Sequence, residues 1–202
     1  MSEFRRKLMK GKQYTIVDHV LTNGKVYIDT GYFPNPDTEV ELSCNMGNSV
    51  YSNGTRLWCV TEAPYIYAIN HGGNGTGVLY CWPYKIYGEQ GANINIIETI
   101  EKTDIVIAYK YINEEYRAYV NEQYVKIDTP VHCFSKPLFL LYSDETNTIY
   151  NVRHLKIYSF KILERGKLIK HFVPALKDGI YGMADIIEGK YYASPNGESF
   201  NY

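Results

Sequence analysis

The strongest constraint on the fold is an alternation of apolar and polar residues with a period of two. In residues 38–44, positions 40, 42 and 44 are apolar, whereas positions 39, 41 and 43 are acidic or polar. Residues 25–30 alternate in the same way. Because successive side chains of a strand point to opposite faces of the sheet, this pattern is typical of strands with one buried face. No segment shows a helical period longer than about two turns, so the chain is predicted to be all-β.

The alternation recurs along most of the chain, and clusters of glycine and asparagine separate the alternating segments. Many short strands divided by such turns are typical of a sandwich or a barrel. We therefore predict a two-sheet antiparallel jelly-roll sandwich with two tight hairpins, which turn near residues 121–123 and 164–166. Further strands are expected at residues 56–61, 65–70, 77–82, 94–99, 104–112, 116–120, 124–127, 138–142, 154–163 and 167–173. The residues expected in the core are Val40, Leu42, Ile105, Ile107, Leu138, Leu140, Ile157 and Phe160.

The composition excludes several functional classes. The chain has 202 residues, of which 45% are hydrophobic and 21% charged, so it can bury a core without cross-links. A net charge of −1 argues against a nucleic-acid-binding domain, and no apolar run is long enough to predict a membrane span. None of the four cysteines forms a C-x-x-C pair or lies at zinc-ligand spacing from a histidine. We therefore expect free thiols, no metal and no cofactor.

Aromatic residues crowd the middle of the chain, and tyrosine is unusually frequent, with 21 tyrosines against 7 phenylalanines. Sugars stack on aromatic rings through their apolar C–H faces, so this region is a candidate glycan-binding platform. The alternative is that alternate aromatic residues pack the core between the sheets. Both interpretations remain open from the sequence. The candidate glycan-binding residues are Trp58, Tyr65, Tyr67, Trp82 and Tyr84.

Residues 1–13 differ from the rest and are predicted to form an arm outside the sandwich of residues 14–202. Residues 2–12 carry five positive charges and one negative charge. We expect a docking peptide, in which apolar side chains anchor the arm and two arginines contact carboxylates of a partner. The alternative is a solvated terminus. No apolar run follows the basic residues, so no signal peptide is expected. The docking residues are Phe4, Arg5, Arg6, Leu8 and Met9.

Five stretches resemble a known group of modules. Residues 27–35 read Y-I-D-T-G-Y-F-P-N, and residues 155–162, 168–175, 185–192 and 196–200 are similar to the closing strands of the same group. These stretches resemble laminin-G-like, concanavalin-A-like β-sandwich modules over residues 14–202, with a poorly matched middle. The resemblance implies a sandwich of gut bacteria or their phages, found in virion and surface proteins and without a defined catalytic set. The start S-E-F-R-R-K-L-M resembles structural proteins of Bacteroidales phages.

Asp37, Glu39 and Glu41 form the only dense row of carboxylates. On a strand they share a face, so acid–base chemistry is conceivable, and a glycan hydrolase of this fold is one interpretation. However, the E-x-D-x-x-E string of retaining β-glucanases with this fold is absent, as are G-x-S-x-G and H-x-x-x-H. We expect these acids to be a solvated outer face and the protein not to be an enzyme.

The resulting expectation is a non-enzymatic virion protein of a phage capsid or tail, assembled in the cytoplasm of the bacterial host. The arm would contact other virion proteins, and an exposed face would bind host or mucosal glycans. No nucleic-acid or membrane partner is expected, and a homo-oligomer would be compatible with this role. The main alternative is a bacterial carbohydrate-binding, lectin-like module in which the arm has no function.

Overall fold

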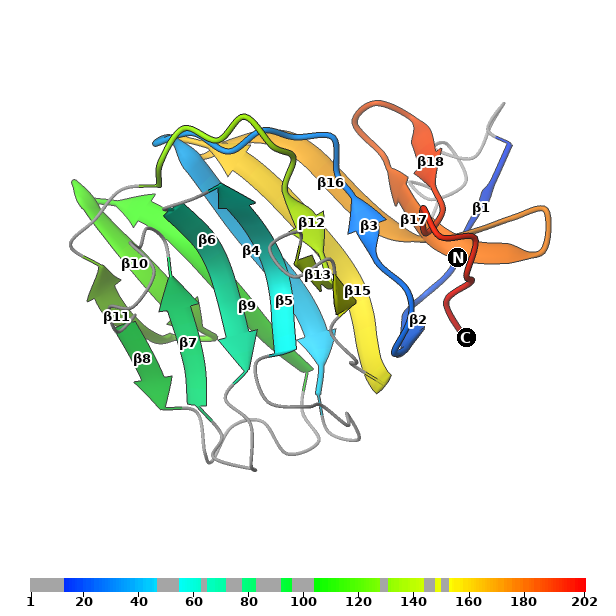
Figure 1. Cartoon of the computed structure of the whole chain (residues 1–202), viewed down its shortest axis with the longest axis horizontal. Helices are drawn as coiled ribbons and strands as arrows, with labels where there is room; N and C mark the ends of the chain where they lie inside the picture. The colour runs from blue at the N-terminus through cyan, green and yellow to red at the C-terminus, as the bar shows by residue number, and fades with distance from the viewer. Residues whose placement is uncertain are drawn as a thin grey trace.

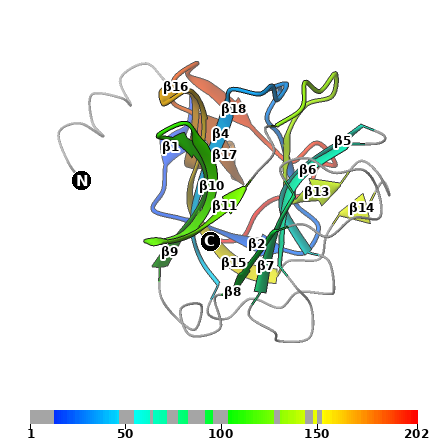
Figure 2. The same cartoon turned by 90° about the vertical axis from the view of Figure 1, so that its left-hand side faces the viewer.

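The computed structural model describes residues 13–46, 55–62, 65–71, 78–82, 92–95, 104–127, 131–143, 148–149 and 153–202. Over these residues the chain forms strands and turns, and no helix that could cross a membrane is found there. The strands form two main antiparallel sheets and one small hairpin. Figure 1 shows the strands, and Figure 2 shows the two main sheets as facing layers. The predicted two-sheet antiparallel sandwich is confirmed.

The larger sheet contains ten strands and carries the surface discussed below. Its central strands β9, β4, β15 and β16 come from distant parts of the chain, and the hairpin β10–β11 extends it to one edge. The order is β11 (Gln123–Ile127), β10 (Glu115–Val120), β9 (Asp104–Ile112), β4 (Thr38–Asn45), β15 (Arg153–Glu164), β16 (Lys167–Lys177), β17 (Ile180–Asp185) and β18 (Lys190–Tyr192), with β1 (Thr15–Ile16) beside β16 and β2 (Val20–Asn23) beside β15.

The smaller sheet contains six strands and covers the inner face of the larger one. Its order is β3 (Ile28–Asp29), β12 (Phe139–Leu140), β5 (Thr55–Glu62), β6 (Tyr65–His71), β7 (Val78–Trp82) and β8 (Ala92–Asn95). A separate hairpin joins β13 (Tyr142–Ser143) and β14 (Thr148–Ile149). The single strand predicted at residues 138–142 is therefore wrong in one respect, because the structure divides it into β12 and β13. Leu141 has a φ of 68°, which breaks the run between β12 and β13.

Tight turns fix the register of the consecutive strands. Residues Arg165 and Gly166 join β15 to β16 with φ angles of 43° and 77°, and Asn113 and Glu114 join β9 to β10 with φ angles of 50° and 64°. Two left-handed residues in a two-residue loop match the twist of the flanking strands. Both predicted hairpins are confirmed, with turns at 165–166 and 121–122.

The core lies between the two sheets and is rich in aromatic rings. Across the layers, Trp58 packs against Phe160 with ring centroids 6.1 Å apart, and Tyr67 meets Tyr109 edge-on at 5.5 Å. All four rings are fully buried. The eight residues predicted for the core are each at most 1% exposed, which confirms that prediction.

Candidate ligand-binding surface

The outer face of the larger sheet, turned away from the smaller sheet, carries an unusual row of cations. Arg117 on β10 is the register partner of Lys126 on β11 and also of Lys110 on β9. Their strand neighbours Ala118 and Tyr109 are buried in the core, so the three basic positions share the outer face. We call Lys110, Arg117 and Lys126 the basic row. Neighbouring side chains in such a row have Cβ atoms about 5 Å apart.

An aromatic pair lies next to the basic row on the same face. Tyr119 on β10 is the register partner of Tyr124 on β11, and their ring centroids are 5.4 Å apart with a tilt of 37°. Tyr124 is 50% exposed, close to the values of Phe33 and Tyr202. The guanidinium carbon of Arg117 lies 4.5 Å from the centre of the Tyr124 ring, within the range of a cation–π contact. Together, the basic row and this pair form what we call the platform.

Glu115 holds two members of the basic row in place. Its Oε2 accepts a hydrogen bond of 3.1 Å from Arg117, and its Oε1 lies 3.1 Å from the Lys126 ammonium. The hydrogen bonds from Lys126 and Arg117 hold the pKa of Glu115 below its usual range. One carboxylate therefore pairs with two cations, and one of them, Arg117, also contacts the Tyr124 ring.

Glu41 likewise pairs with two cations in the centre of the sheet. Lys110 and Lys161 each donate a hydrogen bond of 2.6 Å to one of its two carboxylate oxygens. Burial alone would raise the pKa of Glu41, but the two lysines outweigh this effect and lower it. His171, the register partner of Lys161, has a lowered pKa because of its burial and the positive charge of that lysine.

The Glu41 contacts give a testable pH dependence. A carboxyl whose pKa is lowered by folding stabilises the protein above its unfolded pKa, and this stabilisation is lost as the pH falls through the folded pKa. We expect Glu41→Gln to lower the free energy of unfolding by about 1–2 kcal/mol at pH 7, with the difference shrinking below pH 4.5, the ordinary value for this group. Urea unfolding at neutral and acidic pH measures this. Glu122→Gln, in an exposed turn, is the control, and it should change the free energy of unfolding by no more than about 0.5 kcal/mol. A cost of Glu41→Gln that does not depend on pH would contradict the account.

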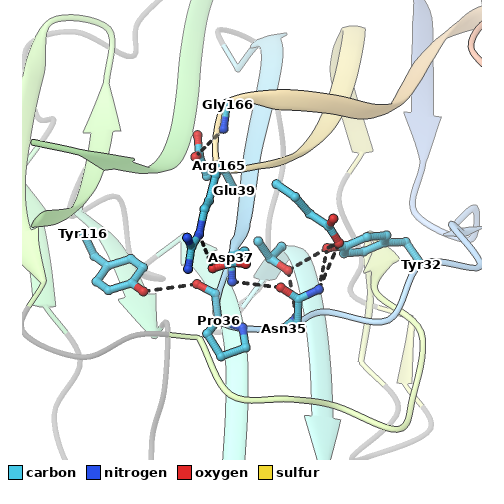
Figure 3. Close-up of polar contacts among 10 residues, drawn as sticks. Tyr32, Asn35, Pro36, Asp37, Glu39, Tyr116, Arg165 and Gly166 are labelled. Atoms are coloured by element: carbon cyan, nitrogen blue, oxygen red, sulfur yellow. Dashed lines mark hydrogen bonds and ion pairs between the residues drawn. The ribbon is translucent and has the colours of Figure 1, made fainter. Parts of the chain in front are cut away.

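Glu39 and Glu41 are not the solvated carboxylates that the sequence predicted, whereas the Asp37 side chain is 42% exposed. Glu39 is 4% exposed, and its Oε1 accepts a hydrogen bond of 2.9 Å from the Gly166 amide. Burial raises the pKa of Glu39, against the effect of that hydrogen bond. Asp37 accepts a hydrogen bond of 2.7 Å from the Arg165 side chain. The prediction failed because the β15–β16 turn, more than 120 residues along the chain, covers the end of this strand (Figure 3).

The same turn is clamped to the loop before β4 by a second set of hydrogen bonds (Figure 3). Glu164 Oε1 accepts from the Tyr32 hydroxyl and from the Asn35 side-chain amide, both at 2.9 Å. Because the Tyr32 hydroxyl has one proton, Thr38 must be the donor in its 2.8 Å contact with Tyr32. Burial raises the pKa of Tyr32 above its ordinary value. The cluster joins two segments of the fold, so we assign it a structural role.

Two of the five predicted glycan-binding residues lie in the core, which corrects the sequence expectation for them. Trp58 and Tyr67 are both 0% exposed, so neither ring face is available to a sugar. Tyr65 and Trp82 lie on β6 and β7, but their side chains are outside the described part, and Tyr84 lies wholly outside the described residues.

The remaining predicted features concern the arm, metals and thiols. The docking residues Phe4, Arg5, Arg6, Leu8 and Met9 lie outside the described residues, so the arm and its boundary remain predictions. Within the described ranges, no group of three or more His, Cys, Asp or Glu side chains could hold a metal ion. Cys44 and Cys59 are buried free thiols and Cys133 is an exposed one. The side chain of Cys81 lies outside the described part.

No protein-family model and no curated protein matches this chain. Among solved structures, it is similar to the CBM40 of the Ruminococcus gnavus IT-sialidase, with 13% identity over 78% of this chain and 92% of the other, and a TM-score of 0.49. It is also similar to Xenopus laevis galectin-Ib, with 9% identity over 67% of this chain and 97% of the other, and a TM-score of 0.37.

Proposed function

We propose that this protein is a non-catalytic, lectin-like module that binds glycans on the platform of the larger sheet. The observation that carries the proposal is Tyr124, a half-exposed ring that contacts Arg117 and shares the outer face with Lys126 and Lys110. A pyranose ring can stack its apolar face on the exposed part of Tyr124. The ammonium groups of Lys126 and Lys110 have further protons to donate to sugar hydroxyls, because an ammonium group has three.

The platform is organised before binding, which favours recognition by a rigid surface. Arg117 is held by Glu115 and by the Tyr124 ring, and its side chain is only 17% exposed. A side chain that is already ordered loses little conformational entropy when a ligand binds. This arrangement supports a binding role for the sheet.

The carboxylates described above support binding over hydrolysis. A glycosidase needs two carboxyl groups free to reach opposite sides of one bond. Glu39, Asp37 and Glu164 are engaged in the turn clamp, and Glu41 and Glu115 are each shared by two cations. We therefore keep the prediction of a non-enzymatic protein as part of the proposal. The placement on a phage virion rests on the resemblances of residues 2–9 and of residues 14–202 described above and stays a separate prediction.

A glycan array probed with the whole chain tests the proposed function. We expect binding that Tyr124→Ala weakens roughly tenfold, because exposed aromatic anchors often contribute more than 1 kcal/mol to an interface. Tyr202→Ala is the matched control, since Tyr202 is 58% exposed and stacks on His19 instead of lying on the platform. The proposal fails if the chain binds no glycan, or if both variants bind as the unaltered protein does.

A further inference from the structure

We propose that the platform recognises acidic glycans, in which the sugar carries a carboxylate or a sulfate group. This inference rests on the proposed function and adds the class of ligand. Its basis is the basic row, in which Lys126, Arg117 and Lys110 occupy directly paired positions on three neighbouring strands. Like charges at directly opposed positions destabilise a sheet. A bound anionic ligand would reduce the repulsion among these three cations.

The surrounding carboxylates do not neutralise the row. Arg117 and Lys126 share Glu115, whereas Lys110 shares Glu41 with Lys161. Four cations therefore meet two carboxylates. If the buried Glu39 near Lys110 is also counted as ionised, the surface still has one more positive charge than negative charges. The chain as a whole has a net charge of −1, whereas these seven side chains together carry one net positive charge.

The position of the aromatic ring favours a single acidic group on a sugar. Arg117 lies over the Tyr124 ring, and Lys126 is the register partner of Arg117 on the Tyr124 strand. A sugar stacked on Tyr124 would bring an acidic substituent to these two cations. Hydrogen bonds from a cationic side chain to an ionised acidic group are shorter and stronger than hydrogen bonds between neutral groups.

A nucleic acid is a poorer fit to the same surface. Single strands are bound by grooves that follow the backbone with continuous positive charge. Here Glu115 and Glu41 lie on either side of Arg117 and Lys110, at places where successive phosphates would be repelled. We therefore commit to an acidic glycan and use an oligonucleotide as a competing probe.

The test measures binding of the whole chain to four probes at two salt concentrations. The probes are polygalacturonate oligosaccharides, dextran sulfate, neutral dextran and a single-stranded oligonucleotide. We expect at least one acidic glycan to bind more tightly than dextran and the oligonucleotide, and to weaken as salt rises, because charge interactions of exposed groups are screened within about 10 Å at 0.1 M salt. Comparing the carboxylated with the sulfated probe identifies the acidic group.

Variants then locate the site. Lys126→Gln should weaken acidic-glycan binding roughly threefold to fivefold, as expected for one exposed charge pair, with an unchanged melting temperature. Lys25→Gln, which removes an exposed lysine paired with Glu198, should bind as before. If dextran binds as tightly as the acidic glycans and Tyr124→Ala weakens that binding, the acidic inference is wrong and the proposed function survives. If no glycan binds, both are wrong. The inference is also wrong if the chain binds the oligonucleotide more tightly than the acidic glycans. It is wrong as well if Lys126→Gln and Lys25→Gln weaken acidic-glycan binding equally.

Discussion

Replacing Trp58 by alanine is expected to lower the free energy of unfolding by about 3–5 kcal/mol, the usual cost of removing a large aromatic side chain from a core. Trp58 is 0% exposed and packs on Phe160 of the opposite sheet, so the substitution opens a cavity between the layers. Urea denaturation followed by circular dichroism measures the change.

Tyr124→Ala is the matched comparison, because Tyr124 is half exposed and lies on the outer face. Its cost should stay within about 1 kcal/mol. The difference between the two losses in free energy of unfolding then distinguishes a buried aromatic residue from an exposed one. A stable Trp58→Ala protein that loses glycan binding would contradict the structural assignment and restore Trp58 as a ligand residue.

Replacing Asp185 by alanine is expected to be comparably costly, at about 3–5 kcal/mol. Asp185 is fully buried, and its Oδ1 accepts hydrogen bonds from the amides of His171 and Ile187 at 3.1 and 3.0 Å. Its Oδ2 lies 3.6 Å from the ammonium of Lys170, whose side chain is 8% exposed. The substitution removes the acceptor of two backbone N–H hydrogen bonds and leaves a buried cation with one fewer counter-charge.

Glu188 provides the control for Asp185, because it contacts the same lysine from a more exposed position. Its Oε1 accepts a 2.6 Å hydrogen bond from Lys170, and its side chain is 46% exposed. Glu188→Gln keeps an acceptor oxygen, so we expect a cost of about 1 kcal/mol or less. Equal costs for the two variants in urea denaturation would show that burial of Asp185 is not what makes it important.

The fold could be predicted from the sequence because most of the predicted strands alternate apolar and polar residues with a period of two. The hairpin turn at Arg165 and Gly166 and the burial of Val40 and Leu42 follow from local patterns alone. The break at Leu141 could not be predicted, because an uninterrupted apolar run gives no sign of a positive φ. The clamp on Glu39 depends on a turn 127 residues away, which no local pattern reveals.

The candidate surface was missed for a different reason. Aromatic density in the middle of the chain drew attention to Trp58 and Tyr67, yet a period of two does not say which of two aromatic faces is buried. In the β10–β11 hairpin the sequence held a better signal. Tyr119 lies between the buried Ala118 and Val120, so its outward direction could have been inferred. With tight turns on either side of β10, the basic row could have been inferred as well.

The most direct test of the account is an NMR titration of the isotope-labelled chain with the tightest-binding acidic oligosaccharide, followed through the backbone amides. We predict that the largest shifts fall on the platform strands β9, β10 and β11, around Lys110, Arg117 and Tyr124, with little change around Trp58 and in the β15–β16 turn. Shifts centred on the smaller sheet or on the turn, with the platform unchanged, would contradict the account.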